Sequence, residues 1–140
     1  MVEYKNAEGY PDPTTFYALC AIEKEEKGLR AFRPIIYVCS PYAGDVENNI
    51  AAARRYCRFA VESGFIPIAP HLLFPQFLDD DNPKERELGL FFGNALLSKC
   101  AELWVFGDHI SKGMEAEICR ATWKGYHIRY FTDTCEEVTR

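Results

Sequence analysis

Two carboxylates and a glycine turn stand together in residues 111–119, which read Ser-Lys-Gly-Met-Glu-Ala-Glu-Ile-Cys. The Ser-Lys-Gly turn runs directly into a short helical pattern that carries Glu115 and Glu117. The apolar residues 103–106 just before it, Leu-Trp-Val-Phe, are typical of a buried strand. A strand, a glycine turn and a helix present backbone N–H groups and a carboxylate to a ligand at the carboxyl edge of a parallel sheet. The sequence therefore predicts a ligand site at this turn.

Only one of the two carboxylates can face that site. Positions two apart on a helix differ by about 200° around the axis, so Glu115 and Glu117 point in different directions. The other carboxylate is expected to be a solvated residue near the helix N-terminus, where the helix dipole favours negative charge. Helix geometry alone leaves open which of the two faces the ligand.

Strands and helices alternate along the chain around this turn. Short apolar runs predict the strands, and apolar residues at three- and four-residue steps predict the helices. The prolines of the second strand indicate a sheet margin or a strand end. The expected strands span residues 34–39, 65–70, 102–106 and 127–131, and the expected helices span residues 14–27, 46–63, 84–99 and about 113–124.

This alternation predicts an α/β fold with three layers, Rossmann-like or flavodoxin-like, on a parallel sheet of four or five strands. Right-handed crossovers and the small number of strands favour the core order 2-1-3-4, with a switch point between strands one and three. We expect residues 1–33 to form a turn-rich arm with an extra helix, and residues 34–140 to form one compact domain. Residues 71–83 are expected to be a long connection, and residues 127–131 the last strand.

Two loops converge on the predicted switch point. The loop from Ser40 to Gly44 follows the first strand, and residues 107–113 follow the third. Tyr42 could stack on a base or ribose there, or simply cover the core. His71, just after the second strand, could reach the same crevice or make a structural hydrogen bond.

Composition excludes several classes of protein. The 140 residues carry a net charge of −5, which argues against a general nucleic-acid-binding surface because such a surface needs a basic excess. No apolar run approaches the roughly 20 residues of a membrane helix. The first residues lack the apolar core of a signal peptide, so we expect a cytoplasmic protein with no membrane partner.

No metal and no cofactor are predicted. The six cysteines form no Cys-x-x-Cys pair and are expected to be reduced, buried thiols. The acidic run at residues 79–81 lacks the dispersed spacing of a Ca²⁺ loop and is expected to be solvated. Neither Gly-x-Gly-x-x-Gly nor a P-loop occurs, so dinucleotide and ATP sites of those kinds are unsupported.

Three pieces of the sequence together resemble the nucleoside 2-deoxyribosyltransferase-like superfamily. They are Tyr-Val-Cys-Ser-Pro at residues 37–41, Asn94 before an apolar strand, and the Ser-x-Gly-x-x-x-Glu spacing from Ser111 to Glu117. The likeness covers roughly residues 34 to 131. Within the superfamily the chain is most similar to small bacterial and phage proteins with a Trp-Val-Phe-Gly strand end and a Ser-x-Gly-Met turn, and it is similar also to 2′-deoxynucleoside 5′-phosphate N-hydrolases.

This resemblance implies an enzyme that cleaves or transfers the N-glycosidic bond of a nucleoside or nucleoside 5′-monophosphate. Glu117 matches the nucleophile, which attacks the anomeric carbon as in a retaining glycosidase. Such relatives form homo-oligomers, and the predicted N-terminal helix with Phe91 and Phe92 could instead bind a partner or a second copy. The residues predicted to contact the substrate are Tyr37, Ser40, Pro41, Tyr42, Gly44, His71, Asp108, Ser111, Gly113 and Met114.

Asn94 departs from the family pattern. The matching position usually holds an aspartate that assists the leaving base, whereas an amide donates a hydrogen bond but no proton, so we expect catalysis slowed by roughly 10² to 10⁴. Glu87 or Asp108 could take over that role instead. A second hypothesis is that the chain is a non-catalytic nucleotide-binding or sensing module on the same fold.

Ser111 bears on the choice between nucleoside and nucleotide. The resemblance implies that nucleoside transferases carry an aspartate here, whereas the nucleotide hydrolases carry a serine near the 5′-phosphate. A hydroxyl beside helix N–H groups suits an anion, which favours a nucleoside 5′-monophosphate. The first loop lacks the arginine of the nucleotide hydrolases, which weakens that assignment. Ser111 is also expected as a simple N-cap, and the two roles are compatible.

Overall fold

The computed structural model describes residues 13–31 and 33–139 of the chain. The chain divides into two compact units, residues 1–33 and residues 34–140, which are described separately. The described part of the first unit is α1 (Pro13–Ala31), which is longer than the helix expected over residues 14–27. The turn-rich segment predicted for residues 1–12 lies outside the described residues. No helix among the described residues is long and apolar enough to cross a membrane.

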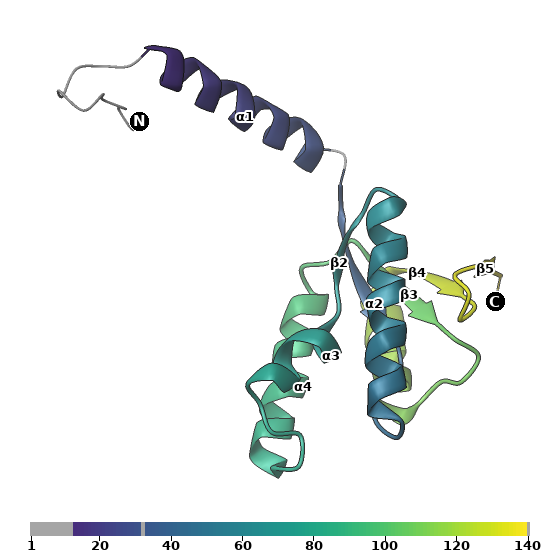
Figure 1. The fold of residues 1–140 in the computed structure, drawn as a ribbon. Helices are drawn as coiled ribbons and strands as arrows, with labels where there is room; N and C mark the ends of the chain where they lie inside the picture. Colours follow the sequence, from purple (N-terminus) through teal and green to yellow (C-terminus); the bar gives the residue numbers. More distant parts are fainter. Residues whose placement is uncertain (1–12, 32, 140) are drawn as a thin grey trace. The chain divides into compact units, whose positions relative to one another are not determined.

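The second unit is built on a five-stranded sheet (Figure 1). Its order is β2-β1-β3-β4-β5, and the first four strands run parallel, so the predicted α/β class and core order 2-1-3-4 are confirmed. The proline-bearing second strand lies at the sheet margin, as expected. The strands are β1 (Ile35–Cys39), β2 (Ile66–Ile68), β3 (Glu102–Phe106), β4 (His127–Phe131) and β5 (Glu137–Val138).

The fifth strand agrees with the predicted count of four or five, but its position was not predicted, because residues 127–131 were expected to be the last strand. It has two residues and pairs antiparallel with β4. An ion pair holds it there, with 2.6 Å between Nη2 of Arg129 on β4 and Oε2 of Glu137 on β5. A strand this short has no periodicity that could be read from sequence.

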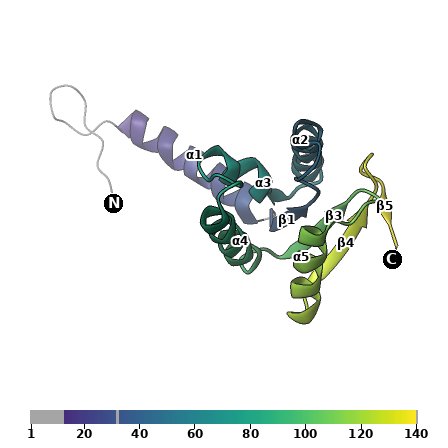
Figure 2. The ribbon, with the colours of Figure 1, turned by 90° about the horizontal axis from the view of Figure 1, so that it is seen from below.

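Helices cover both faces of the sheet, which confirms the three predicted layers. Figure 2 shows α2 on one side and α4 and α5 on the other. The connection expected at residues 71–83 folds locally into two short helices before α4. The helices of this unit are α2 (Val46–Glu62), α3 (Pro70–Leu73), the 3₁₀ helix η1 (Phe74–Gln76), α4 (Pro83–Leu97) and α5 (Lys112–Trp123).

Alternate residues of the central strands supply two separate cores. Side chains on a strand point to opposite faces in turn, so Tyr37 and Val105 pack on the side of α4 and α5, while Val38 and Trp104 pack on the side of α2. Burial on both faces explains why β1 and β3 read as continuous apolar runs. The sheet centre is therefore held rigidly between two apolar layers.

The turns at the carboxyl edge of the sheet prepare the site. Asp45 begins α2 by accepting a hydrogen bond from the backbone N–H of Asn48 at 3.4 Å. Gly107 ends β3 with φ +93°, a left-handed conformation that favours glycine. Ser111 then begins α5, where its hydroxyl accepts from the N–H of Met114 at 3.3 Å. These turns direct the start of α5 back toward the end of β1.

The aromatic core under α2 makes a direct test of this fold. The ring of Phe106 is fully buried and stacks on Tyr56 and Phe131, with ring centroids 4.3 Å and 4.9 Å away. We expect Phe106→Ala to lower the free energy of unfolding by about 3 to 5 kcal/mol, measured by urea denaturation. Phe91→Ala, at a ring that is 67% exposed, is expected to change it by less than about 1 kcal/mol. Equal losses for the two variants would contradict the assigned packing.

Candidate active site

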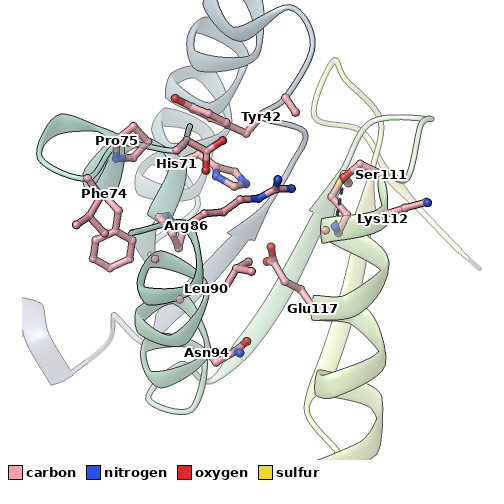
Figure 3. A pocket seen from close by; sticks show the side chains of 18 of the residues that line it. Tyr42, His71, Phe74, Pro75, Arg86, Leu90, Asn94, Ser111, Lys112 and Glu117 are labelled. Carbon is pink, nitrogen blue, oxygen red and sulfur yellow. Dashed lines mark hydrogen bonds between the residues drawn. The ribbon is translucent and has the colours of Figure 1, made fainter. Parts of the chain in front are cut away.

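A cavity of about 290 Å³ opens at the carboxyl edge of β1, on the side of the sheet that carries α4 and α5. Figure 3 shows its side chains converging from α3, α4 and the start of α5. Eight residues predicted from sequence line it: Tyr37, Tyr42, His71, Asn94, Ser111, Gly113, Met114 and Glu117. Residues from four separate elements thus meet around one space.

Glu117 has the most unusual environment of these residues. The side chain projects from α5 into the cavity, and its Oε2 is buried with no hydrogen-bond partner among the described residues (Figure 3). Burial raises the pKa of Glu117 to about 7, because a carboxylate loses hydration there. The nearby Tyr37 hydroxyl and Cys39 thiol oppose that rise in pKa without satisfying Oε2. The cavity therefore contains a carboxyl group with an unused acceptor.

The structure separates the two carboxylates of the motif. Glu115 is exposed and does not line the cavity, whereas Glu117 does. Met114 fixes this helix rotation, because its side chain is buried and its carbonyl accepts from the Cys39 thiol at 3.9 Å. Glu115 is left as a solvated residue of the first helical turn.

Tyr37 lies between the two helices of this layer. It is only 3% exposed, and burial together with the nearby Glu117 carboxylate raises the pKa of its hydroxyl. The hydroxyl therefore stays protonated at neutral pH and can donate to Glu117. On the other side it meets α4 at Gly93, where an added Cβ would lie 3.3 Å from Tyr37 Oη. Glycine at position 93 leaves the room that the phenol occupies.

Ser111 is the N-cap of α5, as expected, and it also lines the cavity. Its hydroxyl caps α5, and the residue lines the cavity beside Lys112 and Gly113. The backbone N–H groups of the first helical turn have no intrahelical acceptors, and the helix dipole favours an anion near them. This end of the cavity is suited to a negatively charged ligand group.

Asn94 faces the cavity from the last turns of α4, opposite Glu117 (Figure 3). Its backbone carbonyl accepts from the N–H of Ser98 at 3.2 Å, so it belongs to the regular end of that helix. Leu90 and Gly93 lie beside it in the wall. The surroundings of the amide are therefore mostly apolar, apart from Glu117 across the cavity.

Tyr42 and His71 form a stacked pair in the cavity wall. Their ring centroids are 4.9 Å apart, with 27° between the ring planes. Burial lowers the pKa of His71, and the carboxylate of Asp80 partly opposes that. The imidazole is therefore neutral at neutral pH. The pair offers flat apolar surface to a ring-shaped ligand.

Four residues proposed from sequence do not line the cavity. Ser40 is 2% exposed and closed off from it, and Pro41 is half-buried beside it in the chain. Gly44, with φ +96°, shapes the turn that leads into α2. Asp108 is exposed in the loop after β3. The helix residue Glu87, considered as a substitute acid, is also exposed and outside the cavity.

Sequence reasoning missed most of the wall that α3, η1 and α4 contribute. Arg86 is the main omission: Figure 3 shows it reaching from the start of α4 toward Ser111. Within the described part of the chain neither Arg86 nor Lys112 takes part in an ion pair. The lining residues not predicted are Ala43, Pro70, Phe74, Pro75, Leu78, Asp80, Glu85, Arg86, Gly89, Leu90, Gly93 and Lys112.

Stability against pH tests the environment of Glu117. Native Glu117 keeps its proton up to a pH of about 7, whereas the unfolded chain releases it near 4.5, the ordinary pKa of a glutamate, so the parent loses stability as pH rises between these values. Glu117→Gln removes this loss. We therefore expect the unfolding free energy of the variant to gain roughly 2 to 3 kcal/mol on the parent between pH 4 and pH 8 in urea titrations.

Glu115→Gln is the matched control, because its carboxylate is exposed on the same helix. The control and the parent should lose stability in parallel over this range. Parallel curves for Glu117→Gln and the parent would show that the buried carboxyl has an ordinary pKa.

Comparison with known proteins agrees with this architecture. No protein in a search of curated sequences matches the chain. Among solved structures, the 2-deoxyribosyltransferase of the psychrotolerant bacterium Bacillus psychrosaccharolyticus matches with a TM-score of 0.57 and 15% identity, over 76% of this chain and 77% of that one. A likeness at this identity shows a shared fold. A family model described as a domain of unknown function, DUF7768, matches residues 34–131, and the chain belongs to that family.

Proposed function

We propose that the cavity binds a nucleoside or nucleoside 5′-monophosphate and breaks its N-glycosidic bond, with Glu117 as the nucleophile. The observation that carries this proposal is the buried, unpartnered Oε2 of Glu117 in the cavity wall. A structural glutamate would be expected to have its buried oxygens paired. A carboxyl group in a cavity wall with an oxygen unpaired among the described residues is instead suited to meet a carbon that develops positive charge. The fold shared with a 2-deoxyribosyltransferase supports the same reaction class.

The reaction follows the two-step course of a retaining glycosidase. The ionised Glu117 oxygen attacks C1′ of the sugar, the C1′–N bond breaks, and its electron pair leaves with the base. This gives a glycosyl ester on Glu117. Water then releases the sugar in hydrolysis, or a second base takes it in transfer.

Tyr37 positions the nucleophile. Its protonated hydroxyl lies beside Glu117 and donates toward the carboxylate, which favours the reactive ionised form. Because Tyr37 lies on a central strand packed from both faces, the donor has little freedom to move. Its role is to orient the carboxylate and to share its charge.

Arg86 and Lys112 support a monophosphate as substrate. Both line the cavity, as does Ser111 at the N-terminus of α5. The Arg86 guanidinium offers several N–H donors to one phosphate group. The first loop lacks an arginine, and Arg86 from α4 supplies that charge from the opposite wall. Asp80 and Glu85 also line the cavity, and their carboxylates would repel a phosphate bound away from these donors.

Base release tests the proposed chemistry directly. The purified chain is incubated with deoxynucleosides and their 5′-monophosphates, and free base is measured by chromatography. We expect release that Glu117→Gln reduces by at least about 10³, because an amide cannot act as the nucleophile. Glu115→Gln should retain the parental rate. A folded parent that shifts its melting temperature with a nucleotide but releases no base would favour the nucleotide-sensing alternative.

The pH profile provides a second test of the same group. Only ionised Glu117 can attack C1′, so kcat/KM should rise with pH up to about 7 and then level off. An ordinary carboxylate would give a profile that is already flat above pH 5 or so. Initial rates between pH 5 and pH 9 distinguish the two.

The phosphate assignment is tested by Arg86→Gln. We expect it to raise KM for a nucleoside 5′-monophosphate by about 10- to 100-fold, because it removes a charge-assisted hydrogen bond, while kcat/KM for the free nucleoside stays nearly unchanged. Lys84→Gln, two residues earlier in α4 and outside the cavity, is the control. Equal effects on nucleoside and monophosphate would contradict a phosphate contact.

A further inference from the structure

Among the described residues, the part of the cavity wall at Asn94 holds no acid for a leaving base. Asn94 stands opposite Glu117, and the wall beside it consists of Leu90 and Gly93. An amide donates hydrogen bonds but keeps its protons at any accessible pH. Departure of a neutral base from C1′ leaves negative charge on its nitrogen, which calls for a proton from a nearby acid.

The other titratable groups of the wall do not supply that acid. The Tyr37 hydroxyl is engaged with Glu117, and its pKa is raised. His71 is stacked against Tyr42 and is neutral. Glu85 precedes Asn94 by nine residues on α4, which separates their backbones by about 13 Å.

Asp80 and Lys112 belong to other parts of the wall. Asp80 comes before α4 begins, and its carboxylate acts on His71. Lys112 is the first residue of α5, beside Ser111 and about one and a half turns before Glu117.

We propose that this cavity acts on nucleotides whose base already carries a positive charge, namely N-alkylpurine or pyridinium nucleotides. The inference rests on the proposed function and names the substrate class of that same site. What carries it is the juxtaposition of a buried carboxylate at Glu117 with an amide, and no acid, at Asn94.

The chemistry balances without a general acid. An oxygen of Glu117 forms a bond to C1′ as the C1′–N bond breaks, and the electron pair returns to the cationic ring, which leaves as a neutral base. Water then attacks C1′, the carboxylate departs, and one proton is released to solvent. In sum, a cationic N-glycoside and water give the free sugar phosphate, a neutral base and a proton.

The charge of the nucleophile suits such a base. A cation is attracted by a nearby carboxylate, and the attraction is stronger where burial lowers the local dielectric. The negative charge of Glu117 also favours a cation before the reaction begins.

Two matched pairs of substrates test the inference, because the members of each pair share sugar and phosphate and differ in the charge of the base. One pair is N7-methyl-2′-deoxyguanosine 5′-monophosphate and 2′-deoxyguanosine 5′-monophosphate. The other is nicotinamide mononucleotide and its reduced, neutral form. Each rate is divided by the uncatalysed rate of the same compound, which removes the intrinsic lability of the cationic bond, and Glu117→Gln is the blank.

We expect the enhancement for at least one cationic member to exceed that of its neutral partner by about 10² or more. The pair that responds distinguishes an alkylated purine from a pyridinium ring. Equal enhancements within both pairs would overturn the inference and leave the proposed function intact. Release from none of the four compounds or the deoxynucleotide panel would overturn both.

The variant Asn94→Asp tests the inference by restoring an acid at this position. An acid at this position should speed release of the neutral guanine by about 10² without speeding release of the methylated base, so the ratio of the two rates falls. A merely structural role would change both rates by the same factor, and that result would overturn the inference. The comparison within the parent protein stands even where this variant unfolds.

Discussion

The site depends on a carboxyl group held where its charge is poorly solvated. Glu117 projects from α5 toward the central strand β1, close to the Tyr37 hydroxyl and the Cys39 thiol, with one oxygen unpaired among the described residues. Such burial opposes folding at neutral pH, so the surrounding structure must be stable enough to impose it. The apolar layers on both faces of β1 and β3 provide that stability. Rigidity of the sheet and reactivity of the carboxylate are therefore two aspects of one arrangement.

Most of the fold could be predicted because its signals are local and strong. The apolar runs of β1 and β3 and the helical period of α2 depend on near neighbours in sequence, and right-handed crossovers then left few strand orders. The parts that were missed have weak or long-range causes. The two residues of β5 are held by the Arg129–Glu137 ion pair, and α3 with η1 folds within a segment that carries two prolines and no period.

The residues of the candidate site differ in the same way: those in one local motif could be predicted, and those from distant elements could not. Ser111, Gly113, Met114 and Glu117 belong to one short motif, and a single helix rotation brings them to the cavity. Arg86 lies some thirty residues away on a helix with no sequence signal for the cavity, and only the packing of α4 opposite α5 reveals it. Conversely, Ser40 and Asp108 follow the correct strands, yet the chain turns so that neither lines the cavity. Position in sequence identified the sheet edge but not which side chains reach the space beside it.

The contact between Gly93 and Tyr37 links the two walls of the cavity. The Tyr37 phenol fills the space that a methyl group at position 93 of α4 would need. A substitution on α4 can therefore change the environment of the Glu117 carboxylate, although that carboxylate belongs to α5. A side chain as small as alanine would press on the hydroxyl and shift its angle to Glu117. Selection can thus retune proton affinity and attack geometry through shape alone, leaving every charged and hydrogen-bonding group of the pocket unchanged.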